Sequence, residues 1–303
     1  MKKIVITHDL GLSSEDMGRL KSLGDVVVYD SRPSSVDEWL ERVKGANIIC
    51  SGISGLKDGY KDLKNVFISL PMVGYSYLDK EILEKNNIKV ANSPGCNKDA
   101  VAEWIVGMVI NLLRDLLFFV DNNSLPKDKA PQATRSLVDR KILILGKGNI
   151  GTRVGEICEA LKMKVSFFKR GDNLIDKVKG QEIIVNCLSA NDSSVNLLDE
   201  NFFNALEKGI FFVSVSNNTV YNAKSMFKAL DNGKIYRAAI DEGTMPAGAT
   251  DDEYYQKLLN HPKILATPHI AYNTDYTDKL GNKIMIDNIE AYLNNKPINL
   301  IYS

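Results

Sequence analysis

The 303-residue sequence contains few of the residues that bind metal ions or form disulfides. It has four cysteines and three histidines, and no two cysteines form a CxxC pair. Metal centres and disulfide frameworks need such residues at close spacing. We therefore expect no metal site, and we interpret the cysteines as buried, reduced thiols of a cytosolic protein.

The sequence also lacks an excess of charge of either sign. Lysine plus arginine and aspartate plus glutamate number 38 each, so the formal net charge is zero. Proteins that bind nucleic acid or anionic lipid usually carry a basic field. The balance therefore favours neither nucleic acid nor a membrane as a partner.

No apolar run is long enough to cross a membrane. The longest, Trp104 to Val120, is interrupted by Arg114-Asp115 and is predicted to form a buried helix. The first ten residues, MKKIVITHDL, lack the apolar core and cleavage site of a signal peptide. We expect a cytoplasmic protein.

Short apolar runs alternate with helical patterns along most of the chain, which predicts parallel sheets covered on both faces. The strands fall into two groups, which predicts two Rossmann-like α/β domains. The expected strands are Lys3–Thr7, Val26–Tyr29, Ile48–Cys50, Val66–Ser69, Val90–Ala91, Lys141–Leu145, Lys164–Phe168, Ile183–Cys187, Ile210–Ser214, Tyr236–Ile240 and Ile264–Ala266. The expected helices include Ser13–Leu23, Val36–Lys44, Asp79–Asn86, Asp99–Val120, Ile150–Leu161 and Asp275–Leu293. The polar, proline-bearing stretch Asp121–Leu137 reads as a connection between domains.

A glycine-rich turn, Gly146-Lys147-Gly148-Asn149-Ile150-Gly151, joins an expected strand to an expected helix. In a G-x-G-x-x-G turn the first glycine allows the tight bend, the second lets backbone approach a pyrophosphate, and the third lets helix and strand pack closely. The helix N-terminus supplies unpaired N–H groups. A glycine-rich turn can exist without a ligand, but the strand before it and the helix after it favour a dinucleotide site.

The end of the next strand usually carries an acidic residue that accepts hydrogen bonds from the adenosine ribose. This sequence has Lys169-Arg170 there. Two cations suit a 2′-phosphate, which favours NADP over NAD. A solvated basic turn is the alternative interpretation.

Beyond the turn, the chain resembles the D-isomer-specific 2-hydroxyacid dehydrogenases. The resemblance extends from about Val66 to Asn295. The matching segments are Val73–Arg114, Asn186–Leu198 (NCLSANDSSVNLL), Ala229–Asp241 (ALDNGKIYRAAID) and Thr267–Ala271 (TPHIA).

This resemblance implies a split substrate-binding, flavodoxin-like domain, residues 1–95 and 270–303, into which an NAD(P)-binding Rossmann domain, residues 96–269, is inserted. The active site would lie in the cleft between them. The resemblance also implies a homodimer with the helix at Asp99–Val120 near the interface.

The family's site residues map onto this chain one by one. The histidine that protonates the substrate oxygen maps onto His269, and imidazole suits acid–base work near neutral pH. The amides that hold the substrate carboxylate map onto Val73 and Gly74, and the nicotinamide carboxamide partner maps onto Asp241. Besides the turn residues Asn149 and Ile150, we expect Leu188, Ser194 and Ser216 at the cofactor site.

Two positions depart from the family pattern. The arginine that grips the carboxylate and polarises the carbonyl is replaced by Asn217, which lacks the charge and the forked donor. The glutamate that keeps the histidine protonated is replaced by Met245, just before Pro246. Glu242 or Glu253 could supply that carboxylate instead.

Two hypotheses follow from this mixture of kept and lost groups. The leading one is an NAD(P)-dependent oxidoreductase that acts on a 2-hydroxy or 2-oxo acid, or a related carbonyl, by hydride transfer with His269 as acid or base. The alternative is a catalytically impaired dinucleotide-binding regulatory or sensor protein of the same fold. A purely structural protein is disfavoured because the turn glycines and His269 are all present.

Overall fold

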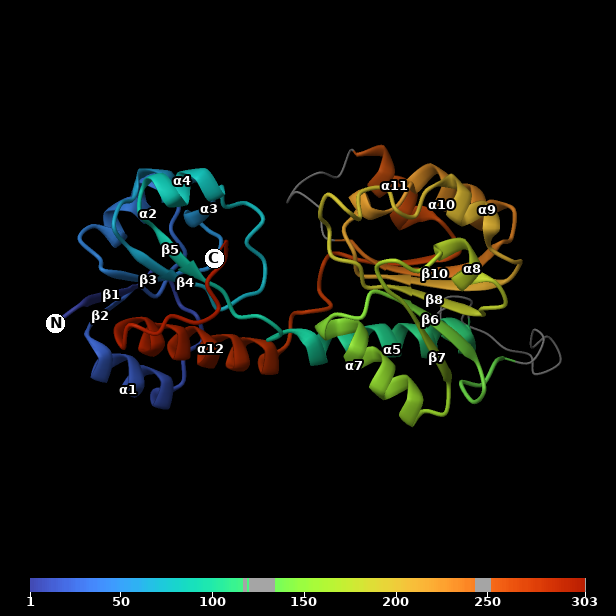
Figure 1. Cartoon of the computed structure of the whole chain (residues 1–303), viewed down its shortest axis with the longest axis horizontal. Coiled ribbons are helices and arrows are strands. Elements are labelled where there is room, and N and C mark those ends of the chain that lie inside the picture. The colour runs from blue at the N-terminus through green and yellow to red at the C-terminus, as the bar shows by residue number, and fades with distance from the viewer. Residues whose placement is uncertain (117–118, 120–133, 243–251, 303) are drawn as a thin grey trace. The chain divides into compact units, whose positions relative to one another are not determined.

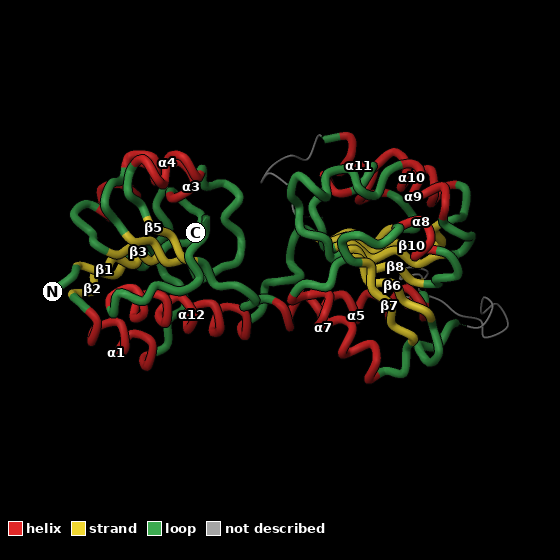
Figure 2. Tube along the Cα trace, viewed as in Figure 1, coloured by secondary structure: helices red, strands yellow, loops and turns green. Residues whose placement is uncertain are grey.

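The computed structural model describes residues 1–116, 119, 134–242 and 252–302. The chain divides into two compact units: Met1–Asn97 with Asn273–Ser303, and Lys98–Tyr272. We call them unit 1 and unit 2. The corresponding boundaries expected from the family resemblance are 95/96 and 269/270. Both units are built from parallel strands and covering helices, as the fold-class prediction states (Figure 2).

Unit 1 is a five-stranded parallel sheet in the order β2-β1-β3-β4-β5. Its strands are β1 (Lys3–Ile6), β2 (Asp25–Val28), β3 (Ile48–Cys50), β4 (Phe67–Ser69) and β5 (Lys89–Ala91). Its helices are α1 (Ser14–Leu23), α2 (Val36–Val43), α3 (Leu56–Gly59), the 3-10 turn η1 (Tyr60–Asp62), α4 (Lys80–Lys85) and α12 (Asp275–Leu293). Figure 1 shows α1 and α12 on one face and α2, α3 and α4 on the other.

The two faces of this sheet bury different side chains, as alternation along a strand requires. Ile4 and Ile6 of β1 pack with Met285 and Ile289 of α12 on one face. Val5 packs among side chains that include Trp39 on the other face. Helix α12 therefore belongs to unit 1 although nearly two hundred residues separate it from β5, and the interrupted chain order of this domain is observed.

Unit 2 is a six-stranded parallel sheet in the order β11-β10-β9-β8-β6-β7. Its strands are β6 (Lys141–Leu145), β7 (Lys164–Phe168), β8 (Ile183–Asn186), β9 (Ile210–Ser214), β10 (Ile235–Asp241) and β11 (Ile264–Thr267). Its helices are α5 (Lys98–Arg114), α7 (Asn149–Ala160), α8 (Leu174–Val178), α9 (Glu200–Ala205), the 3-10 turn η3 (Asn218–Val220), α10 (Ala223–Asp231) and α11 (Glu253–Asn260).

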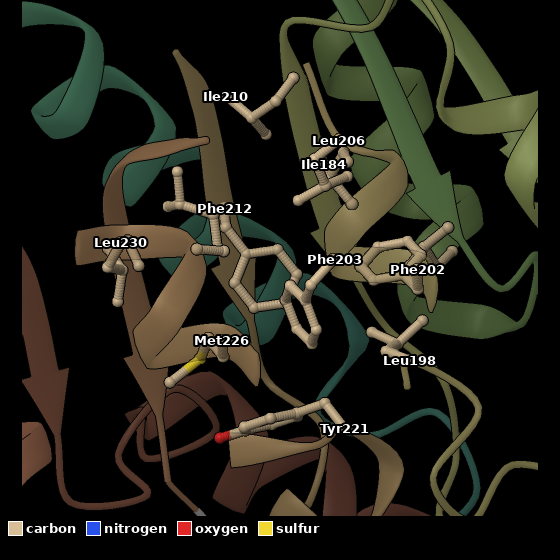
Figure 3. Packing of buried hydrophobic residues seen from close by; sticks show 14 of the residues in the cluster. Ile184, Leu198, Phe202, Phe203, Leu206, Ile210, Phe212, Tyr221, Met226 and Leu230 are labelled. Atoms are coloured by element: carbon tan, nitrogen blue, oxygen red, sulfur yellow. The ribbon is translucent and has the colours of Figure 1, made fainter. Parts of the chain in front are cut away.

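Aromatic rings fill the core under α9 and α10. Phe203 meets Phe202 and Phe212 edge to face, with ring centroids 5.0 and 6.0 Å apart, and Phe212 meets Tyr221 in the same way (Figure 3). Such pairs add about 0.5–1.5 kcal/mol each beyond the apolar area that they bury. The opposite face of the sheet packs against α5 and α7. The strands are therefore fixed from both sides, and their carboxyl ends are held in place.

The inter-domain role predicted for Asp121–Leu137 is wrong. The elements on either side of it, α5 and β6, both belong to unit 2. A polar, proline-bearing composition indicates a surface segment but does not tell which elements it joins. Most of this stretch, and the end of the helix predicted at Asp99–Val120, lie outside the described residues.

The four cysteines are free; Cys50, Cys96 and Cys158 are buried and Cys187 is partly buried. Burial raises the pKa of Cys50, Cys158 and Cys187 to about 12 and that of Cys96 to about 11. The thiols therefore stay protonated at neutral pH and are poor nucleophiles. Within the described part of the chain, no cluster of ligating side chains could hold a metal ion and no helix is long and apolar enough to span a membrane.

Candidate functional site

The glycine-rich turn lies where the sheet of unit 2 reverses its strand order. From β6 the chain goes to β7 on one side, and it then returns to β8 on the other side. Open α/β sheets bind ligands outside the carboxyl ends of the strands at such a switch point. Gly146–Gly151 follows β6 there, and Leu188 lies just beyond β8.

Each glycine of the turn meets the need that its position predicts. Gly146 has φ +97°, a conformation that side-chain-bearing residues rarely adopt. A Cβ on Gly151 would lie 2.1 Å from the Gly146 carbonyl oxygen, so only glycine lets α7 start this close to β6. A Cβ on Gly148 would meet nothing within 4 Å. The space over Gly148 is therefore open to a ligand.

The first turn of α7 offers backbone donors to that space. Its N-cap residue is Gly148, which has no side chain that could accept a hydrogen bond from the first turn. The first N–H groups of a helix have no partner within the helix, and here they begin at Asn149 and Ile150. Unpaired amides with the positive end of the helix dipole suit a pyrophosphate. The turn thus fits a dinucleotide.

The two predicted cations follow the carboxyl end of β7. Lys169 and Arg170 are exposed, and the Arg170 guanidinium lies 3.3 Å from the Ser193 hydroxyl. The nearby Asp172 accepts a hydrogen bond of 2.9 Å from the Lys169 amide and pairs with Lys177 at 3.3 Å. The amide contact, with Lys177, lowers the pKa of the Asp172 carboxyl. That carboxylate is therefore already engaged within its own loop.

The side chains of three predicted cofactor residues make hydrogen bonds to other groups of the protein. The Ser194 hydroxyl donates to the Ser189 carbonyl at 2.6 Å, and the Ser216 hydroxyl donates to the Leu188 carbonyl at 2.7 Å. Both serines are 4% exposed. These bonds fix the loops that follow β8 and β9. The two serines therefore shape the carboxyl edge of the sheet by positioning these loops.

The third such residue, Asp241, holds the segment that carries His269. Its carboxylate accepts hydrogen bonds from the Thr267 hydroxyl at 2.5 Å, the Ile270 amide at 2.9 Å and the Ala271 amide at 2.9 Å. Asp241 is 2% exposed. Sequence reasoning assigned it to the nicotinamide and missed this role, because the donors follow β11 and only the β10–β11 pairing brings them alongside.

His269 itself is exposed and has φ +55°. Histidine adopts this left-handed conformation more readily than most residues, yet it still costs free energy. The three bonds to Asp241 flank His269 on both sides and offset that cost. The imidazole packs edge to face on Tyr272, with centroids 5.3 Å apart. No hydrogen-bond partner of its ring is found among the described residues.

We expect the substitution Asp241→Asn to lower the free energy of unfolding by about 1–3 kcal/mol. The NH₂ group of the asparagine side chain would face the backbone N–H groups that now donate to Asp241, and one of these N–H groups would lose its acceptor. Denaturant unfolding monitored by circular dichroism measures this. Asp192→Asn, at an exposed position, is the matched control and should change nothing. Equal stability of the two variants would contradict the role given to Asp241.

Of the two carboxylates that could replace the missing glutamate, Glu242 is engaged by other side chains. Glu242 is 1% exposed and accepts hydrogen bonds from the hydroxyls of Tyr254 at 2.8 Å and Tyr221 at 3.3 Å. Glu253 is exposed at the start of α11. Met245 and Pro246 lie outside the described residues. Glu242 therefore ties α11 to the segment before α10.

Asn217 caps η3 in a way that orients its amide. Its Oδ1 accepts a hydrogen bond of 2.9 Å from the Thr219 amide. Nδ2 has no partner among the described residues, and Asn217 is only partly buried. An Asn side chain with its oxygen engaged presents its NH₂ as a donor. Asn217 can therefore donate to a carbonyl oxygen, although without charge.

In unit 1, Val73 and Gly74 follow β4 and keep their amides free of protein acceptors among the described residues. The Val73 carbonyl accepts from Asn92 Nδ2 at 2.7 Å, which fixes the loop. A Cβ on Gly74 would meet nothing within 4 Å. Two free amides in an open loop suit a carboxylate.

The family model for the D-isomer specific 2-hydroxyacid dehydrogenase, NAD binding domain, matches residues 106–271, more than half of the chain. The chain belongs to the D-isomer-specific 2-hydroxyacid dehydrogenase family. The match spans the glycine-rich turn and ends at Ala271, two residues after His269. The chain is thus an oxidoreductase of this family's type with a nicotinamide dinucleotide site.

Curated relatives include D-lactate dehydrogenase of Staphylococcus epidermidis, 26% identical over 67% of this chain and 68% of the relative. A putative D-3-phosphoglycerate dehydrogenase of Schizosaccharomyces pombe is 25% identical over 90% of this chain and 63% of the relative.

Solved structures share the fold of this chain. An acyclic imino acid reductase in complex with NADPH and D-Arg has a TM-score of 0.83 at 22% identity, covering 99% of both chains. D-lactate dehydrogenase with NAD+ from Lactobacillus jensenii has a TM-score of 0.80 at 20% identity, covering 100% of both chains. One of these neighbours was thus solved with NADPH and the other with NAD+.

Proposed function

We propose that the protein reduces a 2-oxo acid, or a related carbonyl compound, with NADPH. The observation that carries the proposal is the His269 segment, which Asp241 holds in a left-handed conformation at the same sheet edge as the open turn over Gly148. A strained, exposed histidine fixed by three hydrogen bonds is typical of a group placed for chemistry.

The proposed roles follow from the groups that each residue leaves available. The bound nicotinamide supplies the hydride. His269 donates a proton to the substrate oxygen as negative charge develops on it, and the Asn217 Nδ2 group donates a hydrogen bond to the same oxygen. The amides of Val73 and Gly74 hold the carboxylate. Losing the arginine's charge at this oxygen costs about 2.7–4 kcal/mol of transition-state stabilisation, so we expect slow turnover.

A coupled oxidation screen tests the proposal. Purified protein is mixed with NADPH and with 2-oxo acids, aldehydes and ketones in turn, and NADPH loss is followed. We expect consumption with at least one 2-oxo acid. Binding of NADPH without oxidation by any carbonyl compound would contradict the proposal.

The second candidate function is a dinucleotide-binding regulator without turnover. Asn217 and the His269 ring without a described carboxylate partner favour it. In that case Asn217→Arg combined with Met245→Glu should create activity in a silent parent. A parent that is already active would exclude this candidate.

The proposed preference for NADPH rests on Lys169 and Arg170, which follow the carboxyl end of β7. Replacing both by alanine should weaken NADPH binding about tenfold to a hundredfold, because charge-assisted hydrogen bonds to the 2′-phosphate would be lost, and NADH binding should not change. Fluorescence titration with both cofactors measures this. Lys177→Ala, which lies beside Asp172 in the same region, is the control. An equal loss for both cofactors would contradict the assignment.

From the family membership we also propose that the protein is a homodimer with α5 near its interface. Sedimentation velocity of the purified protein distinguishes a dimer from a chain of 33.7 kDa.

A further inference from the structure

The sheet of unit 1 has a switch point of its own. From β1 the chain goes to β2 on one side, and it then returns to β3 on the other side. In the strand order 2-1-3-4-5, ligands bind at the carboxyl ends of the first and third strands. Thr7 and His8 follow β1 there, and Ser51 and Gly52 follow β3. The site described above uses none of these residues.

A chain of hydrogen bonds at this edge determines which nitrogen of His8 carries the proton. Trp39 Nε1, which can only donate, lies 3.2 Å from Ser51 Oγ, and the Gly52 carbonyl, which can only accept, lies 2.9 Å from that same atom. The single Ser51 hydroxyl proton therefore points to Gly52. Because Ser51 cannot also donate to Thr7, the Thr7 hydroxyl donates to Ser51, at 2.9 Å.

The Thr7 hydroxyl has then used its only proton and must accept from its other neighbour. That neighbour is His8 Nδ1, 3.1 Å away. His8 Nδ1 is therefore the protonated ring nitrogen, and in the neutral ring Nε2 carries a lone pair. Burial, with Arg32 and Arg42 nearby, lowers the pKa of His8 and keeps the ring neutral at pH 7.

His8 is 93% buried, since its exposed fraction is 7%, yet Nε2 has no hydrogen-bond partner among the described residues. Some described side-chain nitrogens are both unpaired and fully sealed from solvent, and Nε2 is not one of them. Nε2 therefore keeps some exposed surface. Gly52 covers part of the ring: a Cβ there would lie 2.9 Å from Cε1 and 3.0 Å from Nε2. The absence of a side chain at Gly52 leaves Nε2 accessible.

The charges around the ring restrict what Nε2 can accept. Arg42 is held by the carbonyls of Thr7 and Ser31 and by Glu38, while Arg32 is exposed. Arg32 and Arg42 act on the pKa of the ring in the opposite sense to Asp9, and the net direction is down, so a cationic donor such as an ammonium group is disfavoured. A carboxylate has no proton to donate at neutral pH, and a phosphate monoester, with a second pKa of about 6, is mostly doubly charged there. A neutral donor such as a hydroxyl fits.

The position of His8 relates it to the carboxylate loop of the same unit. Val73 and Gly74 follow β4, and β3 lies between β4 and β1. Two strand spacings of about 4.8 Å separate β4 from β1. Val73 and Gly74 lie four and five residues beyond the end of β4, so this spacing sets only a scale, and a 2-oxo acid with a tail of a few carbons is long enough for a distance of that order.

We propose that His8 Nε2 accepts a hydrogen bond from a hydroxyl group on the tail of the substrate, so that the substrate class is a 2-oxo acid with a further hydroxyl on carbon 4 or 5. This rests on the proposed function for the identity of the acid. The recognition of a hydroxyl at β1 and β3 rests on unit 1 alone.

The test compares matched pairs of compounds: 4-hydroxy-2-oxobutanoate with 2-oxobutanoate, and 5-hydroxy-2-oxopentanoate with 2-oxopentanoate. In the full-length protein with NADPH we expect kcat/KM to be about fivefold to tenfold higher for the hydroxylated member of at least one pair. Equal values within both pairs, or a preference for 2-oxoglutarate with its distal carboxylate, would overturn the proposal.

Three variants locate the effect. Gly52→Ala keeps the His8 residue but puts a methyl group so close to Cε1 and Nε2 that the ring or the loop must shift, and it should abolish the preference. His8→Phe should abolish it as well, whereas His8→Gln, which retains an acceptor oxygen, should keep part of it. His261→Phe in unit 2 is the matched control and should keep all of it. A preference that survives Gly52→Ala and His8→Phe would overturn the proposal.

Two measurements separate this proposal from the proposed function. If no carbonyl compound is reduced, calorimetric binding of the same pairs to the protein with NADPH should still favour the hydroxylated member, and equal affinities would overturn the proposal. Nitrogen NMR of labelled protein should show His8 Nδ1 protonated and Nε2 bare. A proton on Nε2 would overturn it whatever the activity.

Discussion

Replacing His269 by asparagine is expected to lower kcat at least about a hundredfold, because general acid catalysis contributes about 10²–10⁴-fold and asparagine cannot supply a proton at neutral pH. Asparagine is chosen because it tolerates the left-handed backbone, φ +55°, that His269 adopts. The measurement is steady-state NADPH oxidation with the best carbonyl substrate of the screen.

The control readouts separate chemistry from folding. The NADPH dissociation constant and the unfolding midpoint of His269→Asn should equal those of the parent, since the bonds of Asp241 go to Thr267, Ile270 and Ala271. Tyr272→Phe keeps the ring that packs on the imidazole and should retain nearly full activity. A His269→Asn enzyme with more than a tenth of the parent's kcat would contradict the assigned role.

Alanine at the third glycine of the turn is expected to destabilise the fold, whereas alanine at the second is expected to leave its stability unchanged. Gly151→Ala places a Cβ 2.1 Å from the Gly146 carbonyl oxygen, a backbone atom that cannot move aside alone. Overpacking of this kind costs about 1–3 kcal/mol or more. Thermal unfolding should show a clear loss of stability, with cofactor binding lost as well.

Gly148→Ala is the matched variant, because its Cβ would meet nothing within 4 Å. Its unfolding midpoint should stay near that of the parent, while NADPH binding should weaken at least about tenfold because the methyl group occupies the approach to the helix amides. A Gly148→Ala protein that binds NADPH as tightly as the parent would contradict the placement of the pyrophosphate.

The architecture was predictable because the strands have clear signals. Buried parallel strands are short apolar runs bounded by polar residues, and Ile48–Cys50, Lys141–Leu145 and Ile210–Ser214 were predicted with the bounds that the structure has. The glycine turn was predictable for a similar reason, since its constraints are local to six residues. Helix α12 joins unit 1 across a long sequence separation, and that was inferred from family resemblance only.

The details of the site were less predictable, because they depend on contacts between distant segments. The bonds from Asp241 to the His269 segment exist because β10 and β11 are paired, and the burial of Glu242 depends on Tyr221 and Tyr254. The tautomer of His8 depends on Ser51 and Trp39, which no local pattern connects to it. Asn217 as a cap was also hidden, although Asn before a short turn is a recognisable signal.

Parallel titrations of the purified protein with NADPH and NADH, followed by the intrinsic fluorescence of the bound nicotinamide, test the dinucleotide site directly. We expect saturable binding of a dinucleotide at the Gly146–Gly151 turn, with a lower dissociation constant for NADPH. Tighter binding of NADH would contradict the role of Lys169 and Arg170, and binding of neither would contradict the dinucleotide site itself.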